Sequence, residues 1–322
     1  MDNKPLLSIA IPTWNRAKSL ESALQHLLPQ ADKYNDVLEI IISDNGSTDS
    51  TQDIIEKYSI LYPKLLIINN RNEKNIGFYG NFKKCRELAE AKYIWILSDD
   101  DFILSELIET IISTIIESSQ MAFIYLKHNS QFQGFDKVFV NGNMILNSES
   151  YRLGFISSII FLNSKNYDEE LFVEYNENAF IGLIFTLNSL RYFPEAVIIR
   201  GNCFKPSNDK PKGYNYFKVF VQDMQEVVSF ASTINIDKKV IDRFQFKYLT
   251  EFLRPRYIRY KLDGIKVGDL EYSNRYENNL IFLRSYYKKT FFWLLFFPLI
   301  CLPASVIRAI YSTYKKIQRN DN

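Results

Sequence analysis

The sequence has few of the residues that metal and redox sites most often use. Its 322 residues include only three cysteines, Cys85, Cys203 and Cys301, and two histidines, His26 and His128. The cysteines are far apart and form no Cys-x-x-Cys pair, which argues against a disulfide framework or a thiolate zinc site and favours a reducing compartment. Two histidines also argue against a Ser-His-Asp triad or a histidine-rich metal site. Any metal expected here is therefore a hard cation held by carboxylates.

The chain also lacks an excess of charge of one sign. Lys and Arg total 39 against 37 for Asp and Glu, a formal net charge of +2, which argues against a general nucleic-acid binder. Apolar residues at 47% and charged residues at 24% are ordinary for a globular protein of one large or two modest domains, and exclude a disordered chain, a fibre and a polytopic membrane protein. Charge and Pro5 come too early for the apolar core of a signal peptide, so we expect no secretory leader.

The first half of the chain alternates short apolar runs with stretches of helical periodicity. Such runs predict buried strands, and apolar residues three and four apart predict helices. Their alternation favours an α/β fold with right-handed βαβ units around a mostly parallel sheet. We expect Ser47 or Thr48 to cap the second helix. The predicted strands span residues 6–11, 37–42, 65–68, 93–97 and 121–126, and the predicted helices span residues 19–28, 48–62, 79–91 and 102–118.

The second half of the chain is less regular. Residues 130–150 are polar and contain glycines, which indicates a hairpin or a loop. Lys, Pro and Gly cluster near residue 210, where we predict a boundary between a domain of residues 1–210 and a helical C-terminal region of residues 211–322. The other predicted elements are strands over residues 154–162 and 195–199, a helix over residues 179–192 and a mainly helical pattern over residues 216–287.

Polar clusters follow four of the predicted strands. In a parallel sheet the carboxyl ends of the strands share one edge, and ligands bind beyond that edge. We therefore expect the four clusters to meet at a ligand site. The clusters are Pro12-Thr13-Trp14-Asn15-Arg16, Ser43-Asp44-Asn45-Gly46-Ser47-Thr48-Asp49, Asn75-Ile76-Gly77 and Ser98-Asp99-Asp100-Asp101.

The last of these clusters carries the clearest chemistry. The adjacent carboxylates of Asp99, Asp100 and Asp101 repel one another, so that one takes up a proton unless a cation neutralises them. Mg²⁺ or Mn²⁺, held by one or two carboxylates and by ligand phosphates, meets that need. Taken alone, each cluster also fits a solvated turn or a helix start, where Asp and Asn are favoured. The ordered combination is what makes the pattern specific.

In this order the clusters resemble those of family 2 glycosyltransferases, which have the GT-A fold, a Rossmann-like and mostly parallel sheet flanked by helices. The resemblance covers about residues 5–125. It rests on the Pro-x-x-Asn element at Pro12, on the segment that begins at Asp44 and on the acidic cluster. It implies a nucleotide-sugar half over residues 1–125 and an acceptor half over residues 126–210.

The resemblance also implies roles for individual residues. Asp44 would accept a hydrogen bond from the N3–H of a uracil or thymine base, and Asp99 would lie near the ribose. Asp100 would be the direct metal ligand, although Asp101 remains open for that role. The residues assigned to nucleotide-sugar binding are Pro12, Thr13, Asn15, Arg16, Asp44, Asn75, Gly77 and Asp99.

The implied reaction is an inverting, metal-dependent transfer from a UDP- or dTDP-sugar. Breaking the sugar–phosphate bond develops negative charge on the diphosphate, which Mn²⁺ or Mg²⁺ stabilises, and a carboxylate must deprotonate the acceptor hydroxyl. Relatives often carry an acidic pair just before an apolar helix. Glu177 stands there with Asn178 in place of the second acid, so Glu177 and Asp101 are the catalytic candidates. The other acids of the segment remain open, namely Asp168, Glu169, Glu170 and Glu174.

An apolar run near the end of the sequence points towards a membrane. Residues 290–307 contain no charge and have basic residues on both sides. The run is near the lower limit for spanning about 30 Å of hydrocarbon, and Pro298 and Pro303 break it, so we expect a re-entrant or interfacial element on the cytoplasmic face. A buried core helix or an oligomer contact is the alternative. Residues 254–261 interleave basic and aromatic residues, which either meet lipid headgroups or a lipid diphosphate or pack on their own domain.

These features lead to one expectation and two rivals. We expect a cytoplasmic glycosyltransferase, peripheral or monotopic at the inner face of a bacterial cell membrane. Its acceptor would be a polyprenyl-diphosphate-linked glycan for O-antigen, capsule or a similar surface polysaccharide. A nucleotidyltransferase would need a glycine-rich basic loop, which residues 13–16 do not provide. A non-catalytic, membrane-bound scaffold with a GT-A-like fold is the other rival, and it predicts that the acidic cluster is dispensable.

Overall fold

The chain forms two compact units. The computed structural model describes residues 4–118, 120–163, 169–205, 218–234, 236–263, 283–310 and 312. Unit 1 comprises Met1–Ser148 and Arg152–Asp209, and unit 2 comprises Glu149–Tyr151 and Lys210–Asn322. The candidate acid Asp168 and the predicted boundary near residue 210 lie outside the described residues.

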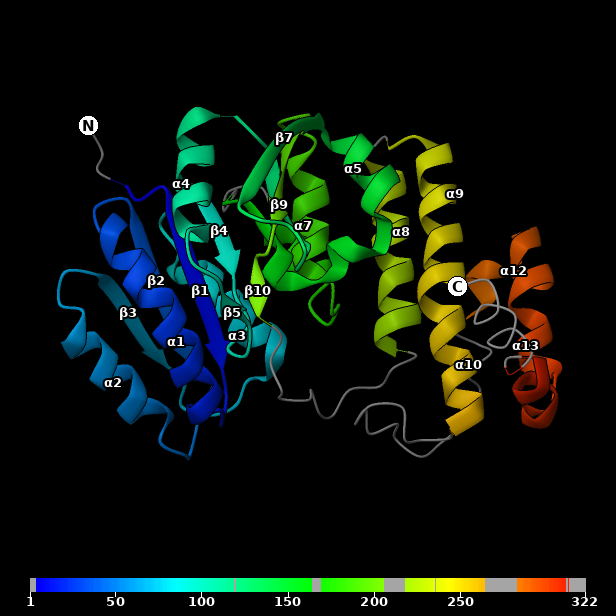
Figure 1. Ribbon diagram of the computed structural model, residues 1–322, viewed down its shortest axis with the longest axis horizontal. Helices are drawn as coiled ribbons and strands as arrows, with labels where there is room; N and C mark the ends of the chain where they lie inside the picture. The colour runs from blue at the N-terminus through cyan, green and yellow to red at the C-terminus, as the bar shows by residue number, and fades with distance from the viewer. Residues whose placement is uncertain are drawn as a thin grey trace. The chain divides into compact units, whose positions relative to one another are not determined.

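Unit 1 is built on an eight-stranded sheet with the order β3-β2-β1-β4-β8-β6-β9-β7 (Figure 1). All of its strands except β7 and β8 run in the same direction. This mostly parallel sheet, flanked by helices, confirms the predicted fold class. The strands are β1 (Leu7–Thr13), β2 (Leu38–Asp44), β3 (Leu66–Arg71), β4 (Tyr93–Ile96), β6 (Phe123–His128), β7 (Phe135–Asn141), β8 (Ile159–Leu162) and β9 (Glu195–Gly201), and a separate pair is formed by β5 (Phe102–Ile103) and β10 (Phe204–Lys205).

Helices cover both faces of this sheet. They are α1 (Ala17–Ala31), α2 (Thr51–Leu61), α3 (Gly77–Leu88), α4 (Leu107–Glu117), α5 (Gly142–Glu149), α6 (Glu169–Glu174) and α7 (Ile181–Ser189). Alternate residues of a strand point to opposite faces. Ile9 and Ile11 of β1 belong to a core shared with α1, α2 and α4, whereas the buried Ala10 between them lies on the face where α3 packs. On α3, Phe82 stacks against Phe185 of α7, with 6.1 Å between the ring centroids.

Long-range pairing shifts several elements from their predicted places. The helix predicted over residues 102–118 begins only at Leu107, because residues 102–103 form β5 and pair with β10. Residues 130–150 are not simply a hairpin or a loop, since they contain β7 and α5, and β7 pairs with the distant β9. Only the last part of the strand predicted over residues 154–162 forms β8.

Unit 2 is helical in the part of the chain that the structure describes, as predicted. Its core contains the buried aromatic residues Tyr248, Tyr286, Phe292 and Phe296. No single described helix is long and apolar enough to cross a membrane; a pair of helices, Thr290–Cys301 and Ala304–Ile310, meets the length and composition together but is bent by 117°. The labelled helices are α8 (Met224–Thr233), α9 (Lys238–Lys247), α10 (Arg254–Asp263), α12 (Thr290–Leu295) and α13 (Phe297–Cys301), with π-helical segments Lys218–Asp223 and Tyr248–Leu253 and a 3₁₀ turn Leu283–Tyr286.

Candidate active site

The four polar clusters meet at the carboxyl-terminal edge of the unit 1 sheet. Parallel register sets Thr13 opposite Asp44 across β1 and β2, and the Asp99 cluster follows β4 on the other side of β1. The Thr13 Oγ1 hydroxyl donates to Asp99 Oδ2 at 2.7 Å, which joins the first cluster to the fourth. The Asn45 Nδ2 amide donates to Asn75 Oδ1 at 2.9 Å, which joins the second cluster to the third. The predicted convergence is therefore present in the structure. Pro12 lies within β1, in register with Ser43 of β2.

Asn15 joins the first cluster to the second. Its backbone N–H donates to Ser47 Oγ and its Oδ1 accepts from the Thr48 N–H, both at 2.8 Å. Asn15 has a φ of +52°, in the left-handed region that Asn tolerates better than most residues. The prediction that Ser47 or Thr48 caps α2 is wrong, because α2 begins only at Thr51 and both residues come before its N-cap position, Ser50. Instead, Asp49 Oδ1 accepts from the N–H of Thr51, the first residue of α2.

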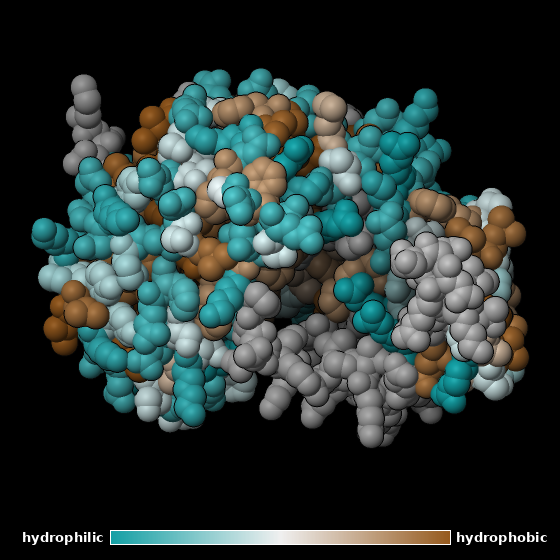
Figure 2. All heavy atoms as spheres, viewed as in Figure 1, coloured by the Kyte–Doolittle hydropathy of each residue, from teal (hydrophilic) through white to brown (hydrophobic). Residues whose placement is uncertain are grey.

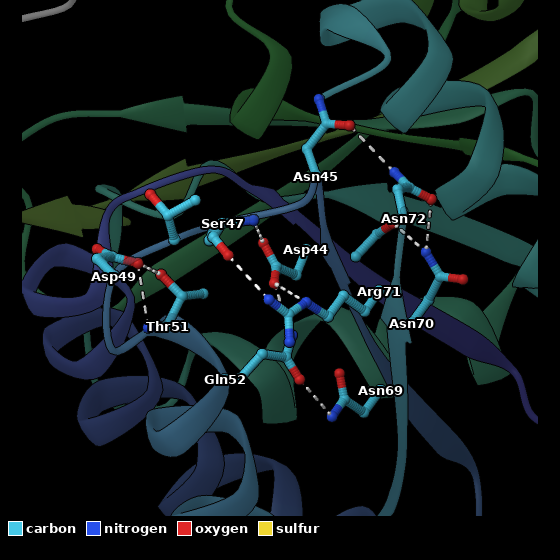
Figure 3. A network of polar contacts seen from close by, with 12 residues as sticks. Asp44, Asn45, Ser47, Asp49, Thr51, Gln52, Asn69, Asn70, Arg71 and Asn72 are labelled. Atoms are coloured by element: carbon cyan, nitrogen blue, oxygen red, sulfur yellow. Dashed lines mark hydrogen bonds and ion pairs between the residues drawn. The ribbon is translucent and has the colours of Figure 1, made fainter. Parts of the chain in front are cut away.

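Asp44 is fully buried at the carboxyl end of β2. Its Oδ1 accepts from the Ser47 N–H at 2.9 Å and its Oδ2 from Gln52 Nε2 at 2.7 Å. Arg71, opposite Asp44 at the end of β3, brings its Nε within 3.7 Å of Oδ2 while 57% of its side chain stays exposed (Figure 3). The sequence analysis missed Arg71 and Gln52. The predicted strand over residues 65–68 ended too early, since β3 continues to Arg71, and the charge of Arg71 therefore falls at the end of the actual strand.

Asn45 fixes the segment of the third cluster. Its Oδ1 accepts from Asn72 Nδ2 at 3.1 Å (Figure 3). The same oxygen accepts from the Ile76 N–H at 2.9 Å. Its Nδ2 donates to the Gly77 carbonyl at 3.1 Å as well as to Asn75. The Gly77 N–H donates in turn to Asn75 Oδ1 at 2.8 Å. Both predicted residues of this cluster thus lie at the same edge of the sheet as Asp44, held by one amide.

The carboxylate of Asp99 is buried, and that of Asp101 is partly buried. Asp99 is 4% exposed, and burial raises its pKa to about 7, against the lowering effect of the Arg16 charge and the Thr13 hydrogen bond. Burial also raises the pKa of Asp101 to about 6, and the hydrogen bond from Ser157 Oγ at 2.6 Å acts in the opposite direction. Burial disfavours the charged form of a carboxylate, so both residues sit where added positive charge would be most stabilising.

Arg16 connects two carboxylates of the acidic cluster. Its Nη1 lies 3.2 Å from Asp99 Oδ1 and its Nη2 lies 2.6 Å from Asp100 Oδ2. The Ser98 hydroxyl donates to the other Asp100 oxygen at 2.5 Å. The Asp100 side chain is 16% exposed against 5% for Asp99, so Asp100 is the more accessible of these two partners of Arg16.

The acidic cluster fits a divalent cation that takes part of its coordination shell from phosphate oxygens. Over the described ranges, no group of three or more His, Cys, Asp or Glu side chains is arranged to hold a metal ion. Protein side chains alone therefore do not complete a coordination shell. Mg²⁺ and Mn²⁺ use oxygen ligands and often only one or two carboxylates, with phosphates supplying the rest. Asp100 and Asp101 offer such oxygens, and the Arg16 guanidinium leaves an excess of negative charge on the cluster.

Ser157 holds the acidic cluster from the second half of unit 1, and the sequence analysis missed it. Besides donating to Asp101, its hydroxyl accepts from the Ser98 N–H at 3.0 Å, and its carbonyl accepts from Trp95 Nε1 at 2.8 Å. Ser157 lies in the 3₁₀ turn Ile156–Ser158 immediately before β8, which pairs antiparallel to β4. Only the folded sheet brings this turn to the end of β4, so no local signal marks it.

Glu177 lies exposed in the turn between α6 and α7. The start of α7 comes close to the turn that holds Asp101, since a Cβ added at Gly182 would lie 3.8 Å from Ile156 Cγ1. Asn178, which replaces the second acid, is 1% exposed, and its Oδ1 accepts from the Phe180 N–H at 2.8 Å. Asn178 therefore stabilises the approach to α7. The catalytic role of Glu177 stays a prediction.

The sequence of the chain matches a known protein family and several known glycosyltransferases. Residues 8–172 match the family described as glycosyl transferase family 2. The chain is similar to the abequosyltransferase RfbV of Salmonella typhimurium, with 39% identity over 38% of this chain and 35% of the relative. It is also 31% identical, over 37% of each chain, to the GalNAc(5)-diNAcBac-PP-undecaprenol beta-1,3-glucosyltransferase of Campylobacter jejuni. The matched segment thus spans about a third of the length of these curated relatives.

Solved structures share the fold. Residues 1–349 of S. aureus TarS in complex with UDP-GlcNAc superimpose with a TM-score of 0.57 at 19% identity, over 81% of this chain and 76% of that chain. The mannosyltransferase PcManGT of Pyrobaculum calidifontis, in complex with GDP-Man and Mn²⁺, gives a TM-score of 0.50 at 14% identity, over 75% and 69%. At such identities the likeness concerns the fold alone. The sequence match, in contrast, covers half of the chain, and the protein therefore belongs to glycosyl transferase family 2.

Proposed function

We propose that this protein transfers a sugar from a nucleotide-sugar donor to a glycan acceptor, with inversion at the anomeric carbon. The observation that carries the proposal is the meeting of four polar clusters at one edge of the sheet, with Thr13 and Arg16 bonded to the acidic cluster. In α/β proteins, ligands bind beyond the carboxyl ends of the strands, which is where these contacts lie. Both solved neighbours named above hold a nucleoside diphosphate sugar, which supports the same donor class here.

The donor in this proposal is a UDP- or dTDP-sugar. Asp44 supplies the carboxylate that would accept from the N3–H of the base, and the exposed part of Arg71 lies directly beside it. Asn45 holds Asn75 and Gly77 at the same edge, where they would line the nucleotide site. Because Asp44 Oδ1 already accepts from the Ser47 N–H and Oδ2 from Gln52, the base would share an Asp44 oxygen with one of these donors.

The acidic cluster would hold the diphosphate end of the donor. When bound to Asp100 and Asp101, Mn²⁺ or Mg²⁺ would stabilise the negative charge of the leaving diphosphate. Thr13 and Arg16 orient Asp99, which lies deepest. A carboxylate of this chain must then accept the proton of the acceptor hydroxyl. Glu177 is the first candidate for this base because it is exposed near the start of α7, and Asp101, tied to Ser157, is the second.

A donor screen with a binding measurement tests the proposal. We expect hydrolysis of one or a few nucleotide sugars with Mn²⁺ and little without it. Isothermal titration of UDP in Mn²⁺ should show binding to the wild type and a loss of at least tenfold in Asp100→Ala. Asp136→Ala removes a carboxylate of β7 that the cluster does not use and serves as the matched control. Equal UDP affinity in the wild type and Asp100→Ala would refute the metal assignment and favour the non-catalytic scaffold.

The base assignment has its own test. Glu177→Gln and Asp101→Asn each remove one negative charge with little change of shape. If Glu177 is the base, Glu177→Gln keeps the UDP affinity and loses glycosyl transfer by about 10² to 10⁴-fold. If Asp101 also holds the metal, Asp101→Asn loses both. A Glu177→Gln variant that transfers at the wild-type rate would remove Glu177 from the mechanism.

We propose, second, that unit 2 rests on the inner face of the cell membrane as a peripheral or monotopic element, where the acceptor would be a polyprenyl-diphosphate-linked glycan. Within the apolar run, Phe292 and Phe296 are buried, whereas Leu294 is 69% exposed; Ile310, three residues beyond the run, is 59% exposed. Figure 2 shows hydrophobic side chains on the surface of the α12–α13 segment. The undecaprenol in the name of the Campylobacter jejuni relative supports a lipid-linked acceptor.

The upstream run of basic and aromatic residues contributes less to this proposal. Lys261 Nζ donates to the carbonyls of Ile300 and Leu302 at 2.7 Å, so its charge is used within unit 2. The Arg256 guanidinium lies 3.6 Å from the centre of the Phe252 ring. These contacts favour the packing alternative for the two residues.

Vesicle flotation tests the membrane proposal. The double variant Leu294→Ser and Ile310→Ser removes exposed apolar surface from unit 2 and should reduce flotation with anionic vesicles by at least tenfold. Ile60→Ser with Leu61→Ser is the matched control, because these residues of α2 are 80% and 59% exposed but belong to unit 1. Equal loss in both double variants, or no loss in either, would contradict the proposal.

A further inference from the structure

Arg16 pairs with an oxygen of Asp100 to which the proposed cation would bind. Arg16 Nη2 lies 2.6 Å from Asp100 Oδ2, and Ser98 Oγ occupies Oδ1 of the same carboxylate. A divalent cation binds a carboxylate oxygen at about 2.0 to 2.1 Å. A guanidinium at hydrogen-bond distance from that oxygen would stand beside the cation and repel it. Cation binding at Asp100 Oδ2 is therefore favoured when the Arg16 guanidinium moves away from this oxygen.

The surroundings of Arg16 allow such a movement and give it a destination. The Arg16 side chain is 30% exposed, so part of it faces solvent. Its Nη1 contact to the deep Asp99 is the longer of the two, at 3.2 Å. The planar guanidinium matches phosphate oxygens in a two-point arrangement as well as it matches carboxylates. A diphosphate that arrives with the cation thus offers Arg16 a replacement for Asp100.

We propose that Arg16 is a positioning residue that exchanges Asp100 for the donor diphosphate, so that cation and nucleotide bind interdependently. The inference rests on the proposed function, because it needs both ligands at this site. Arg16 compensates the charge of the acidic cluster when it pairs with Asp99 and Asp100, which weakens binding of the cation alone. It gains phosphate contacts when nucleotide and cation are present together, which strengthens the joint complex.

Isothermal titrations of four kinds test this exchange, with Mn²⁺ and UDP each titrated alone and in the presence of the other. In the wild type, UDP tightens Mn²⁺ binding and Mn²⁺ tightens UDP binding by the same factor, as linkage requires. In Arg16→Gln, we expect Mn²⁺ alone to bind about tenfold more tightly, because a positive charge next to Asp100 is gone. We expect UDP to bind about tenfold more weakly in saturating Mn²⁺, because a charged phosphate contact is lost. The coupling factor between the two ligands therefore falls.

Two further variants complete the experiment. Lys57→Gln removes a surface charge on α2, whose ammonium pairs with Glu21 at 2.7 Å, and should leave all four titrations unchanged. Arg16→Lys keeps the positive charge but cannot contact two carboxylates as a fork, and should shift each affinity in the same direction as Arg16→Gln by a smaller factor. Thermal melting identifies any variant that fails to fold, in which case Arg16→Lys carries the test.

The outcomes separate this inference from the proposed function. If the wild type binds neither Mn²⁺ nor UDP, the proposed function fails. If the wild type binds both but Arg16→Gln leaves Mn²⁺ affinity and the coupling factor unchanged, the exchange alone is refuted. A Mn²⁺ affinity that falls in Arg16→Gln would also refute it, since Arg16 would then be a structural support of the cluster.

Discussion

Strand β2 carries a buried carboxylate towards each end, and the two have different kinds of partners. Glu39, towards the amino end, is 1% exposed, and its Oε1 accepts from Ser8 Oγ at 2.5 Å and from the backbone N–H groups of Glu90 and Ala91. Asp44, at the carboxyl end, is equally buried, but the charged group beside it is the exposed Arg71.

The buried carboxylates at the two edges of the sheet therefore have different roles. At the amino edge, hydroxyl and backbone donors compensate the carboxylate, and they join β2 to β1 and to the segment before β4. At the carboxyl edge, Asp44 and Asp99 also accept from backbone, amide or hydroxyl donors, but partly exposed guanidinium groups, on Arg16 and Arg71, lie beside them in addition. Backbone donors cannot leave a carboxylate without unfolding, whereas an exposed arginine can exchange partners. We expect changes at the amino edge to alter stability and changes at the carboxyl edge to alter activity.

Asp100→Asn gives the largest expected effect and tests the carboxyl edge. The asparagine keeps the shape but loses the charge: its oxygen accepts from Arg16, and its amide N–H donates to Ser98 Oγ in place of the present bond from Ser98. We expect the rate of glycosyl transfer to fall by about 10³-fold, or about 4 kcal/mol of transition-state stabilisation. The melting temperature should stay the same or rise, because the Asp100 charge raises the pKa of Asp99 and of Asp101. A marked drop in melting temperature would show that this edge also stabilises the fold.

Glu39→Ala is the matched change at the amino edge. It removes the acceptor of the Ser8 hydroxyl and of the Glu90 N–H and leaves the Ala91 N–H with Ser8 Oγ, which should lower the free energy of unfolding by about 3 kcal/mol. The transfer rate per folded molecule should not change. Urea unfolding and activity at low denaturant measure the two quantities. Glu39→Gln keeps an acceptor oxygen and should lose only about 1 kcal/mol; an equal loss in both variants would mean that the charge, and not the hydrogen bonds, is what matters.

The sequence predicted the carboxyl edge better than the amino edge. Chain order and strand ends were enough to bring Thr13, Asp44 and Asp99 together, because parallel strands fix which ends meet. Nothing local marked Glu39 as more than an acid within an apolar strand, since its donors come from residues 31 to 52 positions away.

The remaining site residues were hidden for the same physical reason. Ser157 reaches Asp101 only because β8 enters the sheet antiparallel beside β4, a pairing that no periodicity indicates. Ser47 looked like a helix cap, which is what its neighbours favour, but its hydroxyl accepts instead from the Asn15 N–H. Short-range preference is overridden wherever a distant strand end offers a donor or acceptor.

Gly46→Ala tests a position where we expect a loss of stability and a loss of nucleotide binding together. Gly46 has a φ of +73°, and an added Cβ would lie 2.9 Å from the Lys74 carbonyl carbon, so both strain and a backbone clash result. We expect a loss of about 2 kcal/mol in the free energy of unfolding, together with weaker UDP binding as the segment at Asn75 shifts. Gly77→Ala is the control for strain without a clash, since its φ is +79° and no atom lies within 4 Å. It should lose about 1 kcal/mol, and equal losses would mean that the clash relaxes.

Asn178→Ala is the smallest and most discriminating change. Asn178 precedes α7 near the carboxyl edge, yet it is 1% exposed, and its Oδ1 accepts from the Phe180 N–H as a capping group does. If a buried side chain with backbone partners affects stability alone, as we expect at Glu39, Asn178→Ala loses about 1 kcal/mol of stability and no transfer activity. Asn178→Asp keeps the acceptor and should restore most of that stability. Because Asn178 is next to Glu177, a transfer rate that falls in Asn178→Ala while stability holds would break the comparison and place the start of α7 in the mechanism.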